Sequence, residues 1–379
     1  MKKNNIKIGV IGCGGRAKDV VSKLLNAWQE IEISSVYDPD KSRASALLSA
    51  CKSENKNIMA DYKDVINDRE LKWIMVFSPN CYHKEHIIAS FRAGKHVFAE
   101  KPLATSIPDC KAIYDAHKKS SSIFATGFVL RYAPIYRKAK EILKSGILGK
   151  IISIAASENI TPSHGAYIMK NWRRFAKFAG PHILEKCCHD LDLLNWYTES
   201  LPSRVSSFGG LDLFKKENLG ILKKLNDNGK KAFEGWFDPA GEKCPFSSEK
   251  DIVDHQCVSM IFRNGISANF QATLSNAIPE RRIYFSCSEG TMITELYSQS
   301  LKFARIGEKI EEISFKGDLH GGGDAILAKE LGEAMINEKE LPSGGEEGLR
   351  SSVVALAIDK ARLESKVINL ETIWKKLGQ

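Results

Sequence analysis

The sequence contains no long apolar run. No stretch of the 379 residues reaches the roughly 18 consecutive apolar residues that a membrane-spanning helix needs. Near the N-terminus, Lys7 interrupts the apolar stretch that begins at Ile6, and glycines dilute it, so it is shorter than the apolar core of a secretory signal. We therefore expect a cytoplasmic protein without a spanning segment.

Cysteine pairs with the spacing of a structural site are also missing. The nine cysteines are an odd number, lie scattered along the chain and include no Cys-x-x-Cys pair. This pattern favours neither a disulfide framework nor a zinc ribbon. We expect reduced thiols that behave as small buried hydrophobic side chains.

Blocks of one charge are absent as well. The net charge of +9 comes from Lys and Arg spread along the chain, and we find neither a nucleic-acid recognition motif nor an internal repeat. We therefore expect no nucleic-acid partner, and a basic site for an anionic cofactor or an acidic sugar fits the charge as well. The length predicts two or three domains.

What the chain does contain begins with a dinucleotide-binding pattern. A β-branched run over 6–11 is followed by Gly12-Cys13-Gly14-Gly15-Arg16-Ala17 and by an amphipathic stretch that ends near Trp28. Strand, glycine turn and helix is the order that a dinucleotide fold requires. Gly12 permits the tight turn, Gly14 lets a pyrophosphate approach the backbone, and Ala17 lets the helix pack on the strand.

A second predicted strand, 32–37, ends at Asp38. This is about the distance from the glycine turn at which an acidic residue binds the adenosine ribose. The alternative is a turn residue in Asp38-Pro39-Asp40. An Asp at this position favours NAD over NADP, although Lys41 and Arg43 leave NADP open.

Further strands alternate with helices. We predict strands over 71–77, 95–99 and 123–127 and a helix over 83–93, which indicates a parallel, doubly wound sheet with ligands at the carboxyl ends of its strands. Asn80 and Lys101 occupy such ends. Lys101 lies between an acid and a proline, so we expect its charge to polarise a substrate oxygen.

The stretch 181–197 carries a chemical face. Apolar residues recur there at helical spacing after Gly180-Pro181, so the pattern predicts one helix. Glu185 and His189 are four apart and would be neighbours. A carboxylate beside an imidazole orients the ring and stabilises its protonated form, as a general base requires. A solvated polar stripe is the alternative, and a metal site is disfavoured because the spacing is not His-Glu-x-x-His.

Two interpretations stay open for two other segments. Residues 171–174 either clamp a sugar, with Arg173 on its polar groups and Trp172 on its apolar face, or form a surface loop. His320 either lies at the mouth of a site or belongs to a hinge whose Asp324 caps the next helix.

The remaining C-terminal segments predict a second sheet. A strand begins at 151, a hairpin joins 256–262 to 266–274, and the strand 282–287 continues an antiparallel sheet. Residues 211–250 have weak periodicity, so we expect an insertion or a mobile excursion there.

Taken together, the motifs resemble the Gfo/Idh/MocA oxidoreductases, relatives of glucose–fructose oxidoreductase and inositol dehydrogenase. The matching segments, in the order of the family, are Ile8 to Gly14, Ser78 to His83, Glu100-Lys101-Pro102-Leu103-Ala104, Gly127 to Tyr132 and the helix that carries His189. Two positions depart from the commoner family pattern: Glu185 stands where most members have Asp, and Cys187 where many have Gly. Lys186 adds a cation that this pattern lacks.

The resemblance implies an α/β protein with a Rossmann domain over 1–126 and a second α/β domain over 127–379, whose last helices pack back on the first. That second domain should contain a large, mostly antiparallel open sheet that supports homodimers or homotetramers. The implied activity is hydride transfer between NAD, or NADP, and a sugar, sugar acid or cyclitol. An NAD-dependent glycosidase that oxidises transiently and eliminates is the alternative, and a non-catalytic cofactor-binding regulator is a third.

Three groups of residues are expected at the site, without a metal. The catalytic groups are Lys101, His189 as acid and base, and Glu185 as its orienting partner. The expected substrate contacts are Arg131, Trp172, Arg173, Lys186 and His320. The expected cofactor contacts are Gly12, Gly14, Gly15, Arg16, Asp38, Ser78, Asn80, His83, Glu100 and Lys101.

Overall fold

The chain forms two compact units. The computed structural model describes residues 5–226, 231–234, 243–318 and 320–379. Unit 1 comprises residues up to 133 together with 322–352, and unit 2 comprises 134–321 together with 353–379. All nine cysteines are free thiols. Within the described ranges, no helix combines the length and the apolar character that crossing a bilayer requires.

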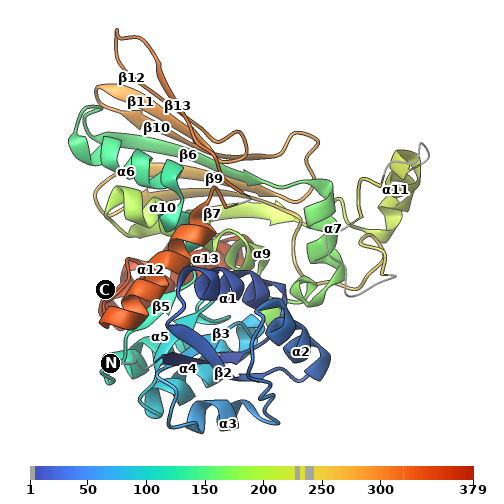
Figure 1. Cartoon of the computed structure of the whole chain (residues 1–379). Coiled ribbons are helices and arrows are strands. Elements are labelled where there is room, and N and C mark those ends of the chain that lie inside the picture. Colours follow the sequence, from blue (N-terminus) through green and yellow to red (C-terminus); the bar gives the residue numbers. More distant parts are fainter. Residues whose placement is uncertain (1–4, 227–230, 235–242, 319) are drawn as a thin grey trace. The chain divides into compact units, whose positions relative to one another are not determined.

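Unit 1 is built on a parallel sheet with the order β2-β1-β3-β4-β5 (Figure 1). A single parallel bridge between Val36 and Ile58 extends the sheet beyond β2, which gives the strand order of a dinucleotide-binding fold. The strands are β1 (Ile6–Ile11), β2 (Ile31–Tyr37), β3 (Trp73–Val76), β4 (His96–Ala99) and β5 (Phe124–Thr126). The predicted parallel sheet is therefore confirmed, with strand ends that differ by one or two residues.

Helices connect and cover these strands. They are α1 (Gly15–Ala27), α2 (Lys41–Ala50), α3 (Tyr62–Asn67), α4 (His83–Arg92) and α5 (Ile107–Lys118), with short 3-10 turns η1 (Asn80–Tyr82) and η2 (Val129–Tyr132). Helix α12 (Gly323–Asn337) returns to pack on α1. The indole N–H of Trp28 donates to the carbonyl of Lys329 at 3.0 Å, and a Cβ at Gly332 would lie 2.1 Å from the Trp28 ring. Only glycine allows so close a contact.

Unit 2 contains a sheet of nine strands with the order β13-β12-β11-β10-β6-β9-β8-β7-β14. The strands are β6 (Ile151–Asn159), β7 (Pro202–Gly210), β8 (His255–Phe262), β9 (Ser267–Thr273), β10 (Glu280–Cys287), β11 (Gly290–Glu295), β12 (Ser300–Arg305), β13 (Glu311–Ser314) and β14 (Ile368–Asn369). Each pairing of neighbouring strands in this sheet is antiparallel except that of β6 with β9. The large, mostly antiparallel sheet is thus confirmed.

The helices of unit 2 are mostly short. They are α6 (Pro134–Ser145), α7 (Pro162–Lys170), η3 (Trp172–Arg174), α8 (Ala176–Ala179), α9 (His182–Glu185), α10 (Cys188–Thr198), η4 (Lys216–Asn218), α11 (Leu219–Asn226) and α14 (Glu371–Leu377). Helix α13 (Gly345–Glu364) begins in unit 1 and ends in unit 2.

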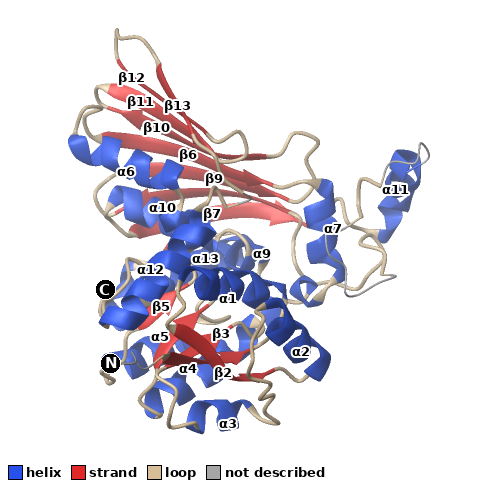
Figure 2. Cartoon of the chain, viewed as in Figure 1, coloured by secondary structure: helices blue, strands red, loops and turns tan. Residues whose placement is uncertain are grey.

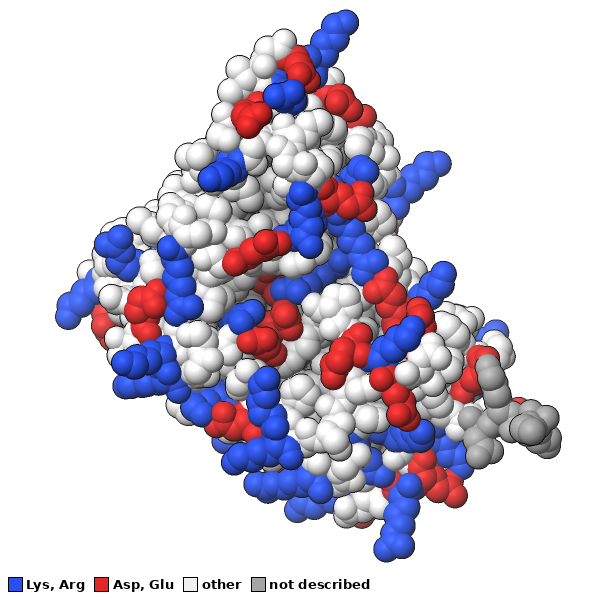
Figure 3. All heavy atoms as spheres, turned by 90° about the vertical axis from the view of Figure 1, so that its left-hand side faces the viewer, with Lys and Arg blue, Asp and Glu red and all other residues white. Residues whose placement is uncertain are grey.

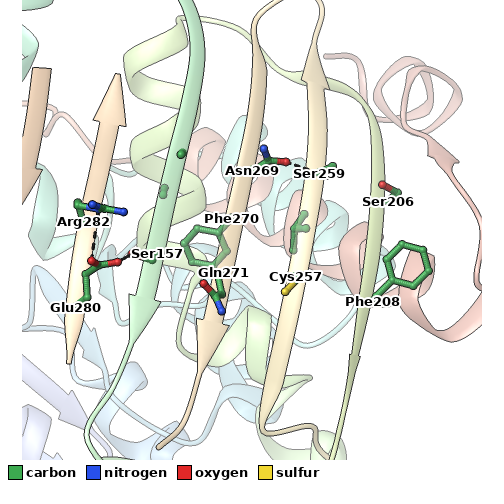
Figure 4. A pocket seen from close by; sticks show the side chains of 13 residues that line it. Ser157, Ser206, Phe208, Cys257, Ser259, Asn269, Phe270, Gln271, Glu280 and Arg282 are labelled. Atoms are coloured by element: carbon green, nitrogen blue, oxygen red, sulfur yellow. Dashed lines mark hydrogen bonds and ion pairs between the residues drawn. The ribbon is translucent and has the colours of Figure 1, made fainter. Parts of the chain in front are cut away.

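The two faces of the nine-stranded sheet differ. Helices α6 and α10 lie along one face (Figure 2), where Tyr197 packs edge-on against Phe285 and donates to the carbonyl of Tyr136. The opposite face is exposed, because every second residue of β8 and β9 points to solvent. Figure 4 looks onto this face, which presents Ser157, Ser206, Cys257, Ser259, Asn269 and Gln271 over a shallow pocket.

Two sequence expectations need correction. The predicted single helix over 181–197 is two helices, α9 and α10, separated at Lys186 and Cys187. The predicted excursion over 211–250 is packed where the structure describes it, because Phe214, Phe233 and Phe246 form a hydrophobic cluster with residues of α7. Residues 227–230 and 235–242 of this segment lie outside the described residues.

Charges of both signs are mixed on the surface. On the face that Figure 3 shows, Lys and Arg side chains are interspersed with Asp and Glu side chains. Pairs three or four residues apart along a helix also occur in the described chain, as between Lys138 and Glu141 and between Lys360 and Glu364. A net positive charge therefore coexists with locally neutral surface.

Candidate active site

The glycine turn after β1 has the predicted geometry. Gly12 has φ +88°, and a Cβ there would lie 2.6 Å from the backbone of Phe77 and Ser78, so only glycine fits. A Cβ at Gly14 or Gly15 would have no described heavy atom within 4 Å. The N-terminus of α1 therefore faces open space, where its backbone N–H groups suit a phosphate.

Asp38 lies against this turn. It is 7% exposed, its Oδ2 accepts from the N–H of Cys13 at 2.8 Å, and its Oδ1 accepts from the N–H of Asp40 at 2.9 Å. Each carboxylate oxygen keeps a second lone pair. The carboxylate is therefore held beside the turn with acceptor capacity left for two ribose hydroxyls.

Arg16 binds three carboxylates. Its Nε donates to Glu100 Oε1 at 2.7 Å, and its Nη1 lies 2.5 Å from Asp324 Oδ1 and 3.0 Å from Asp19 Oδ2. Glu100 and Asp324 are buried. Asp324 does not cap α12, whose N-cap is Gly322 without a side-chain bond. The capping prediction for Asp324 is therefore wrong, because a residue remote in sequence takes its carboxylate.

Glu100 in turn holds Lys101. Its Oε2 accepts from the N–H of Lys101 at 3.2 Å. A Cβ at Gly127 would lie 2.8 Å from the Glu100 carboxyl carbon, so the next strand end encloses this carboxylate. Lys101 therefore follows β4 with a fixed backbone, at the edge of the sheet where Gly12 follows β1.

His83 joins the two strand ends that carry Ser78 and Lys101. Its Nδ1 lies 2.9 Å from the carbonyl oxygen of Pro102, and its Nε2 lies 2.9 Å from that of Ser78. Burial lowers the pKa of His83, while both carbonyls oppose the shift. Since both ring nitrogens face the backbone, we now interpret His83 as a brace rather than as a cofactor ligand.

The other predicted residues of unit 1 are buried. The Ser78 hydroxyl lies 2.9 Å from His86 Nδ1, and burial lowers the pKa of His86 to about 4, so this ring is neutral. Asn80 begins η1 and is 5% exposed. Arg131 donates to the carbonyl of Pro342 at 2.8 Å, and we now interpret it as an anchor for that segment rather than as a substrate ligand.

In unit 2 the structure brings Arg173 and Glu185 together. Arg173 Nε donates to Glu185 Oε1 at 2.7 Å, and Nη1 donates to the hydroxyl of Tyr167 at 3.0 Å. The guanidinium also lies over the Trp172 ring, 4.4 Å from its centroid. The segment 171–174 is thus tied to α9 by a charged pair, which a simple surface loop would not need.

Beyond the break, His189 lies beside His320. Their ring centroids are 6.2 Å apart, so His320 does lie close to the catalytic candidate. Burial lowers the pKa of His182 to about 4, against the effect of Glu158 and Glu185, and it also lowers that of His164. Both rings are therefore neutral near pH 7 and offer one donor and one acceptor each.

Sequence reasoning missed a buried charged group in unit 2. The Lys186 ammonium lies 3.1 Å from Glu158 Oε1, and Arg281 contacts both Glu158 and Asp190. A signal for Glu158 was present. In the predicted strand that begins at 151, alternation places Glu158 on the same face as Ile154 and Ala156, where a charge needs a partner.

The comparisons with known proteins agree with this architecture. Residues 6–128 match the model of the oxidoreductase family with an NAD-binding Rossmann fold, and residues 140–370 match the model of its C-terminal α/β domain. The two models together span most of the chain. The fold and the glycine turn define a dinucleotide-binding oxidoreductase, and the chain belongs to the Gfo/Idh/MocA family.

Two curated relatives show the range of names in this family. Inositol 2-dehydrogenase of Salmonella typhimurium (strain LT2) is 30% identical over 193 residues, which are 50% of this chain and 54% of that protein. The 2,7-anhydro-N-acetylneuraminate hydratase of Escherichia coli (strain K12) is 26% identical over 205 residues, 54% of this chain and 53% of that protein. The chain thus spans about half the length of each of these two proteins.

Solved structures share the fold over the whole chain. Levoglucosan dehydrogenase in complex with NADH and levoglucosan superposes with a TM-score of 0.80 at 18% identity, covering 97% of this chain and all of that one. The apo scyllo-inositol dehydrogenase of Lactobacillus casei superposes with a TM-score of 0.75 at 18% identity, covering 98% and 99%. At this identity the likeness establishes the fold.

Proposed function

We propose that this protein is an NAD-dependent dehydrogenase that oxidises a hydroxyl carbon of a sugar, sugar acid or cyclitol. The observation that carries the proposal is the chain of contacts in which Arg16 binds Glu100 and Glu100 accepts from the backbone N–H of Lys101. It fixes the backbone of Lys101 at the same sheet edge as the glycine turn. The names of the relatives, inositol dehydrogenase and levoglucosan dehydrogenase, support the substrate class.

The residues that would hold the cofactor are those of the turn and its neighbours. Gly12, Gly14 and Gly15 leave the N-terminus of α1 open to the pyrophosphate, and Asp38 offers its carboxylate to the adenosine ribose. NAD bound there supplies a hydride acceptor. Because the carboxylate of Asp38 repels a 2′-phosphate, we propose NAD as the preferred form, with NADP as the lesser one.

Side chains of the protein would then transfer the proton and stabilise the developing negative charge. In the proposed mechanism His189 takes the hydroxyl proton, and the ammonium of Lys101 stabilises the alkoxide that develops. Glu185, itself bound by Arg173, orients the His189 ring. Trp172, Lys186 and His320 are proposed to contact the sugar, through an apolar ring face, a charge and a hydrogen bond respectively.

A redox-neutral reaction is the second candidate. The neutral His164 and His182 give the site more proton donors and acceptors than oxidation alone needs, and one relative is named for a hydration rather than an oxidation. In such a cycle, oxidation to a ketone would acidify the neighbouring C–H, a base would take that proton, and the glycosidic group would leave with a proton from an acid. Water would then add across the resulting double bond, and the hydride would return to the carbonyl carbon.

One assay separates the two candidates. Purified protein with NAD is offered a panel of sugars, uronic acids, cyclitols and aryl glycosides, while absorbance of reduced nicotinamide and release of the aryl group are followed together. Accumulation of reduced cofactor supports the dehydrogenase. Aryl release without accumulation supports the redox-neutral reaction, and neither signal on any substrate rejects both.

We also propose that the exposed face of the nine-stranded sheet joins copies of this chain into a homodimer or homotetramer in the cytoplasm. The face carries small polar side chains and Phe208, whose ring is 71% exposed and could be covered by a second copy (Figure 4). Sedimentation analysis of the protein and of Asn269→Arg tests this proposal. A monomeric wild-type protein would reject it, and dissociation only in the variant would support it.

A further inference from the structure

Three buried ionisable side chains and the partly buried Lys186 lie between the nine-stranded sheet and the break that separates α9 from α10. Glu158 on β6 and Arg281 on β10 are direct cross-strand partners, and both point to the covered face. Lys186 lies in the break itself, and Asp190 lies in the first turn of α10. The sheet therefore presents one carboxylate and one guanidinium to the two ends of the broken helix.

Each end of the break is held by one sheet residue. Arg281 donates through Nε and Nη2 to the two oxygens of Asp190, at 2.9 and 2.7 Å. Its Nη1 lies 3.2 Å from Glu158 Oε1, and the Lys186 ammonium lies 3.1 Å from the same oxygen. Lys186 in the break and Asp190 after it are thus joined through a single Glu158–Arg281 pair.

Glu158 is the ionised carboxylate of this cluster, whereas burial, together with the nearby charge of Glu158, raises the pKa of Asp190 to about 7 against the effect of Arg281. Although burial opposes it, Arg281 and Lys186 hold the pKa of Glu158 well below its usual range. Replacing a buried ion pair by apolar residues is often neutral or stabilising, so such pairs add little to stability by themselves. Their best-supported use is to specify one arrangement among several, and a two-pronged guanidinium is well suited to that.

The arrangement in question is the orientation of Glu185 relative to His189, the two catalytic candidates on either side of the break. Glu185 immediately precedes Lys186, and His189 immediately precedes Asp190. In one continuous helix the backbone would fix the relative orientation of Glu185 and His189. The break interrupts that constraint, since Cys187 has ψ 1° instead of the helical value of about −42°. We infer that side-chain contacts contribute to the orientation instead.

We propose that Arg281 and Glu158 are positioning residues: by fixing Asp190 and Lys186 they set the orientation of His189 relative to Glu185. The proposal rests on the function proposed above, in which His189 is the acid and base. Small displacements of a catalytic group lower turnover strongly, whereas the cofactor turn belongs to the other unit. Loss of Arg281 therefore affects kcat and leaves NAD binding intact.

Variants of one strand residue test this. Arg281→Met keeps an unbranched apolar stem but loses the guanidinium, and Arg281→Lys keeps the charge without the two-pronged geometry. We expect kcat to fall at least tenfold in Arg281→Met and less in Arg281→Lys, with the Kd for NAD within twofold of wild type. Arg263→Met is the matched control, because Arg263 forms a bidentate pair with Glu371, at 3.0 and 3.0 Å, on the exposed hairpin.

A second readout does not depend on turnover. In protein labelled with ¹⁵N-histidine, the His189 ring signals are assigned with His189→Gln. We expect them to move in Arg281→Met and Glu158→Gln and to stay in place in Arg263→Met. A folded Arg281→Met with unshifted His189 signals, or with kcat within twofold of wild type, overturns the proposal.

The two proposals fail in different ways. If no substrate reduces NAD, the proposed function fails, and the ring signals alone decide whether Arg281 positions His189. If Arg281→Met does not fold, Arg281→Lys and Glu158→Gln are judged by the same two criteria. Wild-type turnover with unchanged signals in these variants leaves the function intact and removes the positioning role.

Discussion

Asp38 accepts a hydrogen bond from the backbone N–H of Cys13 at 2.8 Å, although the two residues lie 25 positions apart. This contact places the carboxylate that ends β2 against the turn that ends β1. The position of the negative charge is therefore fixed by the backbone of the turn itself.

Replacing Asp38 should change the cofactor preference. In Asp38→Ser the repulsion of a 2′-phosphate disappears, while the positive charges of Lys41 and Arg43 still attract it. Like charges placed together cost several kcal/mol, so we expect kcat/KM for NADP relative to NAD to rise by roughly 10- to 100-fold. Steady-state kinetics with both cofactors measures this ratio. An unchanged ratio would show that Asp38 serves the turn alone.

Turnover should depend on Lys101 and His189. Lys101→Met and His189→Asn should each lower kcat by roughly 100-fold or more, because proton transfer and alkoxide stabilisation are lost. NAD affinity, measured by titration calorimetry, should stay within about threefold for His189→Asn. The control is His255→Asn, since His255 is exposed and pairs with Asp212. Full activity of the Lys101→Met, His189→Asn double variant would reject the mechanism.

Removing Arg16 should destabilise unit 1. Arg16→Met leaves the buried carboxylates of Glu100 and Asp324 without their shared cation, and breaking a buried pair typically costs about 3 kcal/mol or more. Urea unfolding measures the loss. Asp19→Asn is the control, because Asp19 is 39% exposed and exposed pairs contribute about 1 kcal/mol at most. Equal effects in the two variants would contradict the prediction.

Acid should weaken the fold through buried histidine. Burial lowers the pKa of His182 from 6.5 to about 4, so the unfolded chain binds a proton that the folded one refuses. The stability that this ring contributes is present above pH 6.5 and is lost as pH falls toward 4. Between pH 7 and 5 we expect His182 to account for a loss of about 2 kcal/mol. In His182→Asn the decline should be shallower by that amount, as measured by urea unfolding at both pH values.

The hydrophobic cluster of the 211–250 segment can be tested by truncation. Phe246 is 1% exposed and packs against Phe214 and Phe233. Phe246→Ala should therefore cost about 3 kcal/mol locally. Backbone hydrogen exchange should accelerate in residues 211–226 and 243–250 and in α7. Ile221→Ala, at an exposed position of α11, is the control and should leave exchange rates unchanged.

Local signals in the sequence were enough to predict β1, the glycine turn and α1. There the need for glycine, the β-branched run and the small Ala17 all act within about twenty residues. The break between α9 and α10 could not be predicted in this way, because the apolar spacing continues through Lys186 and Cys187. At the break, Lys186 contacts Glu158, which lies 28 positions earlier in the chain, and Asp190 contacts Arg281, which lies 91 positions later. These distant partners leave no local pattern in the sequence.

The difference between local patterns and contacts of distant segments also explains which site residues could be placed from the sequence. Lys101 and Asp38 follow strands, so their placement at the sheet edge comes from local pattern. The partners of Arg16, His83 and Arg131 come from segments that meet only in the folded chain. Residue type and spacing identify such side chains as polar and noteworthy, but they do not show whether a side chain faces a ligand or another part of the protein.

The Arg16–Asp324 pair joins residues 308 positions apart, and this has a consequence for synthesis of the protein. Unit 1 needs residues 322–352, so a nascent chain that has exposed only its first 133 residues lacks α12. At roughly 5 to 20 residues per second, the ribosome needs about 10 to 40 seconds to supply the rest. We expect the five-stranded sheet to wait in that interval with one flank of α1 uncovered, which makes it a natural client for a chaperone.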